Sequence, residues 1–512
     1  MESAGHSCSG YDIGDHSDDI SGDDSESNSG MNSSGDSDRN SSGDSGWNSG
    51  DDSESYSGRN SSRSSSGDSG WKPDRIQLFT EVRQMADAAS KWYKIDNAAK
   101  IVPSTAVGTD TRVFRLTCEL YEDIDERTLQ KALDLAIPEF PYFGSVLRKG
   151  VFWYYLEASR TPAIVHIENK PPCSAIYHEG RRNLLYRVVY YKKRINLEMF
   201  HVLTDGTGAF EFLKQIVTNY LKIRHELDDD LALPERASVQ GRNDDAFQKF
   251  YEKQNGKPKE SRFAPKKAYH IKGERDENLQ CHLLEGTVST SAFLTAAKEH
   301  NSTMAVFTTS LYIEALLQEM SVRDRKLPIV LSVPVNLRNY FHSDTARNFF
   351  GVINVAFYPE QYDGSLDSII TVVNDSFKRQ LAGDQISLTM NNFAALEHNL
   401  FIKIVPLALK NLVISMANAK AQRGITGTVS NVGKVTMPEL LVPYIHKFSC
   451  FMAAPDAQIC ISSFGDALCF GIASAFSEHA VMMNFFRKIT EMGIDVELAT
   501  TDYNKEIEDE EA

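Results

Sequence analysis

One short segment, FHVLTDGTGAF (residues 200–210), carries the side chains of this chain best suited to acid–base chemistry. His201 follows an apolar stretch with strand character, so the end of a strand would hold its ring at the edge of a loop. Imidazole has an ordinary pKa near neutrality and can take a proton from an alcohol, an amine or a thiol. Asp205 could orient that imidazole, as in a catalytic triad, or turn away and pair with an arginine. Gly206 and Gly208 would permit positive φ and close approach of the backbone to a ligand.

The same spacing also has an ordinary structural explanation. The chain contains 13 histidines, and a buried histidine in a turn is common. A short motif is a hypothesis until its structural context supports it. The residues of this loop alone therefore leave both catalysis and a purely structural turn open.

Strands and helices are expected to alternate on both sides of this loop. Hydrophobic spacing predicts strands at residues 112–120 and 151–158, a strand pair at 184–203, and helices at 125–137 and 209–223. Farther along it predicts helices at 290–300 and 304–320, strands at 327–335, 351–358 and 424–430, and a closing strand pair at 457–476 before a last helix. This pattern predicts an α/β fold with mixed sheets and two lobes.

Composition divides the chain into five parts. Residues 1–71 are rich in Ser, Gly and Asp and repeat the motif SGDSGW. This composition predicts a disordered acidic tail. The tail would keep the chain solvated, or in the alternative would serve as a site of interaction or phosphorylation. An N-terminal lobe is expected at 72–240, a crossover linker at 241–280, a C-terminal lobe at 281–503 and an acidic tail at 504–512. The net charge of −16 lies mostly in the two tails, where fifteen acidic residues face three arginines in 1–70 and five more occupy 506–511. The remainder is nearly neutral, which argues against a nucleic-acid partner.

Other features predict a monomer in the cytoplasm. The seven cysteines form no CxxC pair, so we expect buried thiols rather than disulfides or a metal site. The start has neither a basic end nor an apolar run, as a signal peptide would. No uncharged apolar run is long enough to span a membrane. The nearest, FIKIVPLALKNLVISMA (401–417), is interrupted by Lys403, Pro406 and Lys410, and we expect a core-facing amphipathic helix there, with a membrane-surface segment as the alternative.

The HxxxDG motif followed by a helix resembles the signature of acyltransferases with a chloramphenicol-acetyltransferase-like fold. That superfamily includes alcohol acetyltransferases, wax ester synthases, plant acyl-CoA-dependent acyltransferases and peptide-synthetase condensation domains. Two further segments match in the expected order: SVPVNLRNYF (332–341) with RNFFGVINV (347–355), and TVSNVGKV (428–435). With WYKIDNAAKI (92–101), the chain looks closest to the bacterial alcohol-acetyltransferase-like group. The resemblance implies two such lobes arranged as a pseudo-dimer with a tunnel between them.

Departures from the family patterns narrow the resemblance. Condensation domains usually carry two adjacent histidines, and here Phe200 takes the place of the first. The plant enzymes carry a DFGWG motif near the end, where this chain has SFGDALCFG (463–471). No carrier-protein domain is attached. We therefore expect neither a condensation role in peptide assembly nor a plant-type enzyme.

The resemblance assigns roles to particular residues. His201 would be the general base, and Asp205 would pair with Arg338, although Arg338 could instead lie at the surface or contact a thioester phosphate. The Gly206 amide could help hold the developing oxyanion, which places His201, Asp205 and Gly206 in the catalytic set. Asn336, Ser430 and Asn431 would line the substrate tunnel or help hold the oxyanion. In the alternative, Asn336 holds the loop that carries Arg338, and Ser430 and Asn431 form a simple turn. Tyr93 and Asp96 could face the channel.

The resemblance also implies the co-substrates. We expect acyl-CoA as co-substrate, transfer of an acyl and specifically an acetyl group to a small alcohol or amine acceptor, and no permanently bound cofactor or metal. Two alternatives stay open: a member fed by an acyl-carrier protein, for which residues 257–272 are the candidate basic docking patch, and a non-catalytic member used in binding or assembly.

Overall fold

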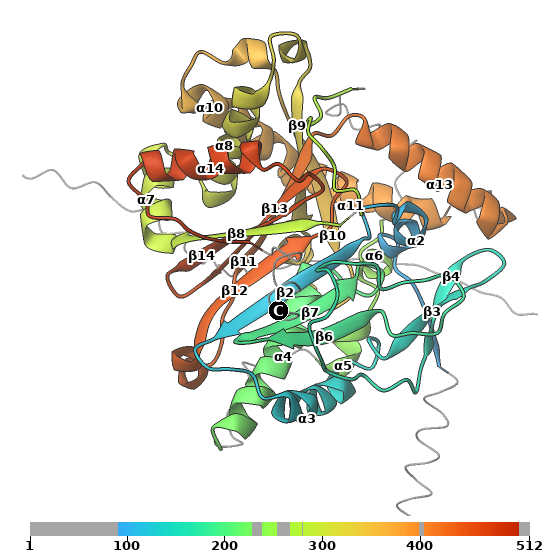
Figure 1. Ribbon diagram of the computed structural model, residues 1–512. Helices are drawn as coiled ribbons and strands as arrows, with labels where there is room; N and C mark the ends of the chain where they lie inside the picture. The colour runs from blue at the N-terminus through green and yellow to red at the C-terminus, as the bar shows by residue number, and fades with distance from the viewer. Residues whose placement is uncertain (1–90, 228–237, 253–266, 279, 399–403, 501–512) are drawn as a thin grey trace, which may run out of the picture. The chain divides into compact units, whose positions relative to one another are not determined.

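The computed structural model describes residues 91–227, 238–252, 267–278, 280–398 and 404–500. The two predicted acidic tails and most of the candidate docking patch at 257–272 lie outside these ranges. Within them the strands form a small sheet and two larger ones, with helices packed against them (Figure 1). The fold is therefore mixed α/β, as the hydrophobic pattern predicts.

The five-stranded sheet carries the HxxxDG segment at the end of a central strand. β7 pairs antiparallel with β2 and ends at Phe200, opposite Val113. α3 and α4 lie together against this sheet (Figure 1), and the side chains of Asp125 and Asp205 cap their first turns. In sheet order its strands are β12 (Ile445–Met452), β2 (Val113–Leu120), β7 (Arg194–Phe200), β6 (Tyr186–Tyr191) and β5 (His166–Ile167), with helices α3 (Glu126–Ala136) and α4 (Gly206–Arg224).

The seven-stranded sheet belongs to the second half of the sequence. β11 runs parallel to both of its neighbours, whereas the other pairs in this sheet are antiparallel. In sheet order the strands are β10 (Phe350–Phe357), β9 (Ile329–Asn336), β11 (Gly427–Lys434), β13 (Ala457–Phe464), β14 (Ala467–Ser474), β8 (His282–Ser289) and β15 (Glu497–Thr500). Its helices include α7 (Thr290–Glu299), α8 (Met304–Glu319), α10 (Leu366–Gln380) and α14 (Ala480–Glu491).

Strand β12 joins the two large sheets, because it follows the second-half strand β11 in sequence yet pairs with β2 in the first-half sheet. It also lies against β13 and β14. The Ser462 hydroxyl donates to the Phe448 carbonyl over 2.9 Å. A Cβ on Gly471 would stand only 1.9 Å from the Cys450 carbonyl oxygen, so only glycine permits this approach. The sheets of the two halves therefore share one closely packed junction.

The remaining elements complete the chain and correct one predicted strand. Residues 151–153 are not part of the strand expected at 151–158, because the Gly150 amide donates to the Trp153 carbonyl and closes a turn. The small sheet consists of β1 (Trp92–Lys94), β4 (Tyr154–Ala158) and β3 (Ser145–Lys149). The other helical segments are η1 (Ala99–Ile101), α2 (Val102–Thr105), η2 (Ile137–Glu139), α5 (Val239–Asn243), α6 (Ala246–Lys249), η3 (Asp324–Lys326), α9 (Arg338–Phe341), η4 (Pro359–Gln361), α11 (Gly383–His398), α13 (Leu407–Gln422) and η5 (Glu439–Tyr444).

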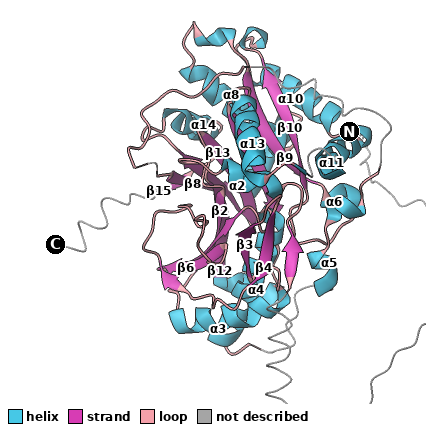
Figure 2. Cartoon of the chain, turned by 90° about the vertical axis from the view of Figure 1, so that its right-hand side faces the viewer, coloured by secondary structure: helices cyan, strands magenta, loops and turns pink. Residues whose placement is uncertain are grey.

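Helix α13 overturns the expectation of a core-facing helix at residues 401–417. It lies at the surface in both ribbon views (Figures 1 and 2), and only Leu407 and Lys410 of this helix are buried. Most of its apolar side chains face solvent. In the part of the chain that the structure describes, no helix has the length and apolar character needed to cross a bilayer.

The described cysteines are all buried and free, in keeping with the expected thiols. Among the described residues no group of His, Cys, Asp and Glu side chains is arranged to hold a metal ion.

Candidate active site

His201 is the first residue after β7, and its position is fixed by backbone and ring contacts. Its amide donates to the Arg112 carbonyl over 3.0 Å, extending the β2–β7 pairing by one step. The imidazole lies between the rings of Phe114 and Phe350, at centroid distances of 5.2 and 5.5 Å. The residue as a whole is partly exposed, whereas residues 202–205 are buried. The ring therefore lies in an apolar setting at the edge of the buried loop.

Asn348 and Asp96 determine which imidazole nitrogen carries the proton. The Asn348 side-chain nitrogen donates to Asp96 Oδ2 at 3.1 Å and to the His201 carbonyl at 3.2 Å. Its amide oxygen must then face His201 Nδ1, 3.0 Å away, and an oxygen can only accept there. Nδ1 is consequently the protonated nitrogen and Nε2 carries the free lone pair. In the described ranges Nε2 has no hydrogen-bond partner.

Burial shifts the pKa of both titratable members of this chain. Desolvation lowers the pKa of His201 below its usual 6.5, and this effect outweighs the raising influence of the Asp205 charge. Burial raises the pKa of Asp96 to about 6, although Arg347 and the Ala99 amide favour its charged form. At neutral pH His201 is thus an unprotonated base and Asp96 an acceptor. This is the protonation state that proton abstraction requires.

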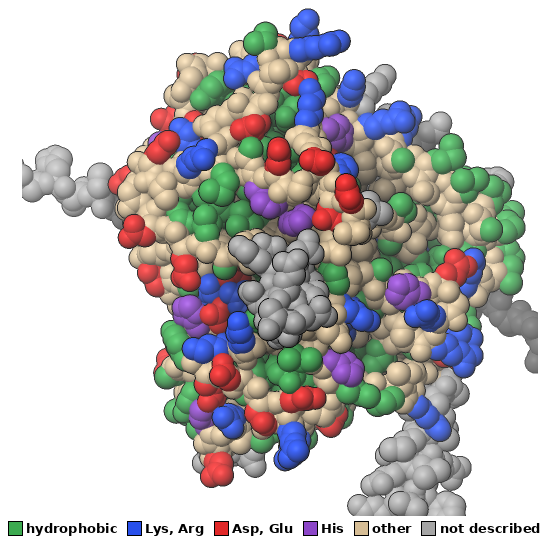
Figure 3. Space-filling view, in the orientation of Figure 1, with side chains coloured by type: hydrophobic (Ala, Val, Ile, Leu, Met, Phe, Trp, Pro, Cys, Tyr) green, Lys and Arg blue, Asp and Glu red, His purple; other side chains and the backbone are tan. Residues whose placement is uncertain are grey.

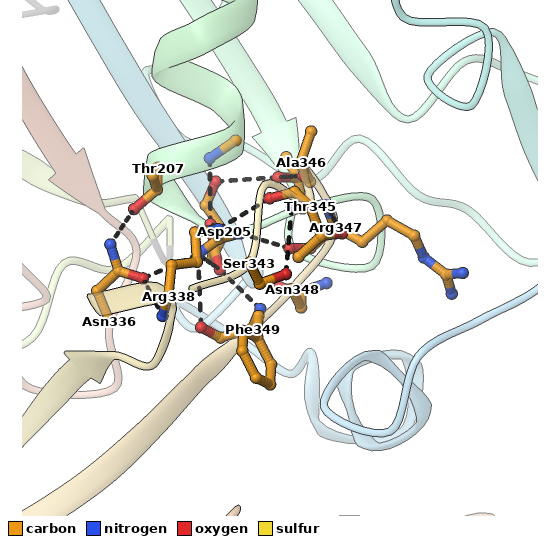
Figure 4. A network of polar contacts seen from close by, with 12 residues as sticks. Asp205, Thr207, Asn336, Arg338, Ser343, Thr345, Ala346, Arg347, Asn348 and Phe349 are labelled. Atoms are coloured by element: carbon orange, nitrogen blue, oxygen red, sulfur yellow. Dashed lines mark hydrogen bonds and ion pairs between the residues drawn. The ribbon is translucent and has the colours of Figure 1, made fainter. Parts of the chain in front are cut away.

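Asp205 does not orient the imidazole, because its carboxylate is fully engaged elsewhere (Figure 4). Arg338 donates to both of its oxygens, over 2.9 and 3.1 Å. The Phe349 amide donates to Oδ2 at 2.8 Å, and the Gly208 amide donates to Oδ1 at 3.1 Å as the cap of α4. The structure therefore brings Asp205 and Arg338 into the ion pair that the sequence analysis expected, and both side chains are about nine-tenths buried.

Arg338 also fixes the loop that carries Asn348. It donates to the carbonyls of Thr345 at 2.8 Å and Arg347 at 2.6 Å (Figure 4). Asn336 accepts from the Arg338 backbone amide at 3.1 Å, so it supports this loop, while its place along a tunnel stays a prediction. The ion pair thus sets the position of the residue that orients His201.

The two glycines of the motif differ in their surroundings, and neither has the positive φ that the sequence analysis anticipated. A Cβ on Gly208 would lie 2.1 Å from the Ala346 carbonyl oxygen and 2.2 Å from Thr204 Oγ1. A Cβ on Gly206 would meet only Val432, at an ordinary 3.7 Å. Gly208 is required because the 343–349 loop presses against the start of α4, and the close approach is to protein backbone.

Strand β11 reaches the motif through Val432, while the two polar residues before it differ in role. Asn431 is exposed, and its side chain accepts from the Gly433 amide at 2.9 Å, where the pairing with β13 shifts register. This is the simple-turn alternative. Ser430 is partly buried and pairs in the strand opposite Cys460. A tunnel or oxyanion role stays a prediction for both residues.

Apolar side chains around the motif belong to the protein interior. Met199, Phe200 and Phe210 are buried in the hydrophobic core. The Tyr93 ring packs edge-on against Tyr142, at 5.3 Å between ring centroids. These side chains support the site by packing alone.

An open crevice lies between segments of the two halves beside this site. Its lining includes Asp110 and Arg112 before β2, and Thr428 and Gln458 from β11 and β13. The Arg112 carbonyl accepts from the His201 amide, so the crevice reaches the residue paired with His201. Its lining is half polar and half apolar, and the side chains of His201, Asp96 and Asn348 are not part of it.

The sequence analysis missed the role of Asn348. This residue stands in the quoted RNFFGVINV segment, directly after Arg347, and a polar side chain ahead of an apolar strand is the only local signal. Asp96 was noted as a channel residue, yet it is completely buried. It contacts Asn348 across 252 positions of sequence.

The sheets and the composite site define a fold that occurs in known structures. Neither a protein-family model nor a curated protein sequence matches the chain. TRI101 of Fusarium sporotrichioides, solved with coenzyme A and T-2, is similar over 78% of this chain and 97% of its own, with 10% identity and a TM-score of 0.53. The first condensation domain of the calcium-dependent antibiotic synthetase is similar over 79% of this chain and 96% of its own, with 12% identity and a TM-score of 0.53. The trichothecene 15-O-acetyltransferase TRI3 of F. sporotrichioides is similar over 79% and 97%, with 10% identity and a TM-score of 0.52.

At such identities the likeness concerns the fold. The chain has the two-lobed, mixed α/β fold that condensation domains and these acetyltransferases share, which is the fold that the three sequence segments imply.

Proposed function

We propose that the protein is an acyltransferase in which His201 acts as general base toward an alcohol or amine acceptor. The observation that carries this proposal is the hydrogen-bond chain from Asp96 through Asn348 to Nδ1, which leaves the Nε2 lone pair unengaged among the described residues. A buried structural histidine would be expected to satisfy both ring nitrogens, whereas here Nε2 has no partner among the described residues. The lowered pKa keeps the base unprotonated at neutral pH.

The chemistry follows from this geometry. Nε2 takes the acceptor proton as the acceptor oxygen or nitrogen attacks the thioester carbonyl, and the carbonyl becomes a tetrahedral oxyanion. The oxyanion collapses, the carbon–sulfur bond breaks, and the leaving thiolate takes the proton from the imidazolium. Gly206 and Thr207 begin α4, so their amides are free of intrahelical partners and are the candidate oxyanion donors. The positive end of the α4 dipole favours the same charge.

We propose acyl-CoA as the donor and no permanently bound cofactor. TRI101, which shares the fold, binds coenzyme A in its solved structure. The crevice beside Arg112 is the candidate entry for such a donor. Ser430, a partly buried residue of β11 that does not line this crevice, is a candidate residue of the substrate tunnel. An acetyl group is the proposed acyl group, and the acceptor is a small molecule with a hydroxyl or amino group.

The test is thiol release from a panel of acyl-CoAs mixed with short alcohols and amines. Wild type should release thiol with at least one pair, and His201→Ala should lower that rate by about 10² to 10⁴. His446→Ala is the matched control, because His446 pairs with Glu119 away from this loop and its loss should leave the rate unchanged. No release from folded wild type with any pair would contradict CoA-dependent transfer. Activity with an acyl-carrier thioester alone would then identify the carrier-fed alternative.

A further inference from the structure

Helix α13 presents its apolar side to solvent. Leu409, Leu412, Val413 and Met416 have exposed fractions of 52, 58, 58 and 65%. Their spacing of three and four residues places them on one side of the helix. A surface helix of a globular protein normally turns this side to the core, so the arrangement is the reverse of the usual one.

The inward side of α13 is held by polar contacts, which fix this orientation. The Lys410 ammonium lies 3.6 Å from the centre of the Trp153 ring, and Lys410 is buried. Asn411 accepts from Ser104 Oγ and donates to the Tyr154 hydroxyl, both over 2.8 Å. Rotating the helix to bury its leucines would break these contacts and leave Tyr154 and Ser104 without their Asn411 partner. The outward apolar side is therefore built into the fold.

The turn between β3 and β4 extends this surface. Val151 and Phe152 are 72 and 45% exposed. The Val151 carbonyl accepts from the Leu407 amide at 2.9 Å, and the Phe152 carbonyl accepts from Lys410 at 2.8 Å. Figure 3 shows hydrophobic side chains gathered at the right-hand edge of the molecule, where Figure 1 places α13. We call the exposed side chains of this region the apolar face: Val151, Phe152, Leu409, Leu412, Val413 and Met416.

The segment that contains α13 carries charge of one sign. From residue 401 to 423 the sequence contains no Asp or Glu, although the whole chain carries −16. Lys420 and Arg423 are exposed and continue the spacing of Leu412 and Met416 along the helix. A row of exposed apolar side chains thus ends in exposed cations.

We propose that the apolar face docks on a lipid bilayer that contains anionic headgroups. A helix in the interfacial region inserts its apolar side below the headgroups, while lysine and arginine reach the headgroup phosphates and carboxylates. A second copy of this chain fits less well, since the same face would bring cations to a surface that has no carboxylate in residues 401–423 to pair with them. The proposal is independent of the acyl-transfer chemistry.

The test is flotation of the full chain with vesicles. Wild type should float with vesicles of phosphatidylcholine and phosphatidylserine, less with phosphatidylcholine alone, and less at high salt. Leu412→Gln/Val413→Gln/Met416→Gln should lower the bound fraction by about tenfold or more, because it removes three large apolar contacts. Lys420→Gln/Arg423→Gln should abolish the preference for the anionic vesicles. These residues are exposed, so thermal unfolding should be unchanged in both variants.

A matched control carries three equivalent changes elsewhere. Leu135, Val322 and Leu440 are 59, 88 and 62% exposed, lie outside the apolar face, and their joint replacement by glutamine should leave flotation as in wild type. Wild type that stays unbound with both vesicle types would overturn the proposal. Equal loss of flotation in the control would overturn it as well. A dimer in size-exclusion chromatography that the α13 triple variant converts to a monomer would show that a second copy covers the face instead.

Discussion

At the scale of single residues, the orientation of His201 depends on an asparagine amide. An amide presents a donor group on one side and an acceptor on the other, and the choice between them is set by the neighbours. The Asp96 carboxylate and the His201 carbonyl both accept, so they fix the Asn348 NH₂ group between them. A flipped amide would set oxygen against two oxygens. The tautomer of His201 is thus decided by a residue 147 positions away in sequence.

The pH dependence of kcat/KM should distinguish a role of Asn348 in orienting His201 from a role in stability alone. In wild type, kcat/KM should stay level through neutrality and fall only below pH 6.5, because burial lowers the pKa of the base. Asn348→Ala should lower kcat/KM by up to about 100-fold through misplacement of the ring. It should also move the acid limb to lower pH, because the hydrogen bond with Asn348 raises the pKa of His201 and its loss lowers that pKa. Steady-state rates between pH 5 and 8 measure both effects.

Asn196→Ala is the control for that experiment. Asn196 is buried in β7 and bonds to Thr117 and Glu168 without touching His201. It should lose comparable stability but keep the acid limb of wild type. An Asn348→Ala enzyme whose limb stays in place, or moves upward, would contradict an orienting role for Asn348.

At the scale of elements, hydrophobic periodicity locates the strands and helices that carry the site. The strand expected at 112–120 is β2, and the helix expected at 125–137 is α3, each within one residue at either end. The helix after the motif begins earlier than expected, at Gly206 and not at residue 209, because the Asp205 side chain caps it. These elements follow from local patterns of side chains, which is why the sequence predicts them.

Contacts between distant segments do not follow from such patterns. α13 has helical spacing, but its inward side was not predictable, because the polar residues Lys410 and Asn411 are satisfied by segments some 250 to 300 positions away. The strand β12 itself was not predicted, and neither was its pairing with β2 in the first-half sheet. The Asp96–Asn348 contact has no local signature either. Hydrophobic periodicity indicates which residues share a side of a helix or strand, but the contacts of that side depend on segments that are distant in sequence.

Two glycines at the start of α4 should differ in how well they tolerate replacement by alanine. Gly208→Ala would force a Cβ to within 2.1 Å of the Ala346 carbonyl, so the loop that carries Asn348 must move. We expect a loss of about 1–3 kcal/mol or more in the free energy of unfolding, with a fall in activity. Gly206→Ala meets only Val432 at 3.7 Å and should unfold like wild type. Chemical denaturation of both variants tests this, and equal stabilities would contradict the close packing.

At the scale of the whole molecule, the candidate site exists only where the two halves of the sequence meet. His201 and Asp205 lie in the loop directly after β7, whereas Arg338 and Asn348 lie in the connection between β9 and β10. The Asp205–Arg338 pair is the charged link between these segments. Removing either partner leaves a mostly buried charge without its counterion, which typically costs about 3–5 kcal/mol. Packing of the halves and orientation of the base are thus coupled through one ion pair.

A double-mutant cycle measures that coupling. Asp205→Ala and Arg338→Ala should each lower the free energy of unfolding by about 3–5 kcal/mol. The double variant should lose clearly less than the sum, with a coupling of about 1–3 kcal/mol, because neither charge is then left unpaired. The matched pair is Arg148–Glu157, whose side chains are 30 and 39% exposed, and its cycle should give at most about 1 kcal/mol. Equal couplings for the two pairs would show that the Asp205–Arg338 link does not hold the halves in register, and the site would then have to be positioned by packing of the strands alone.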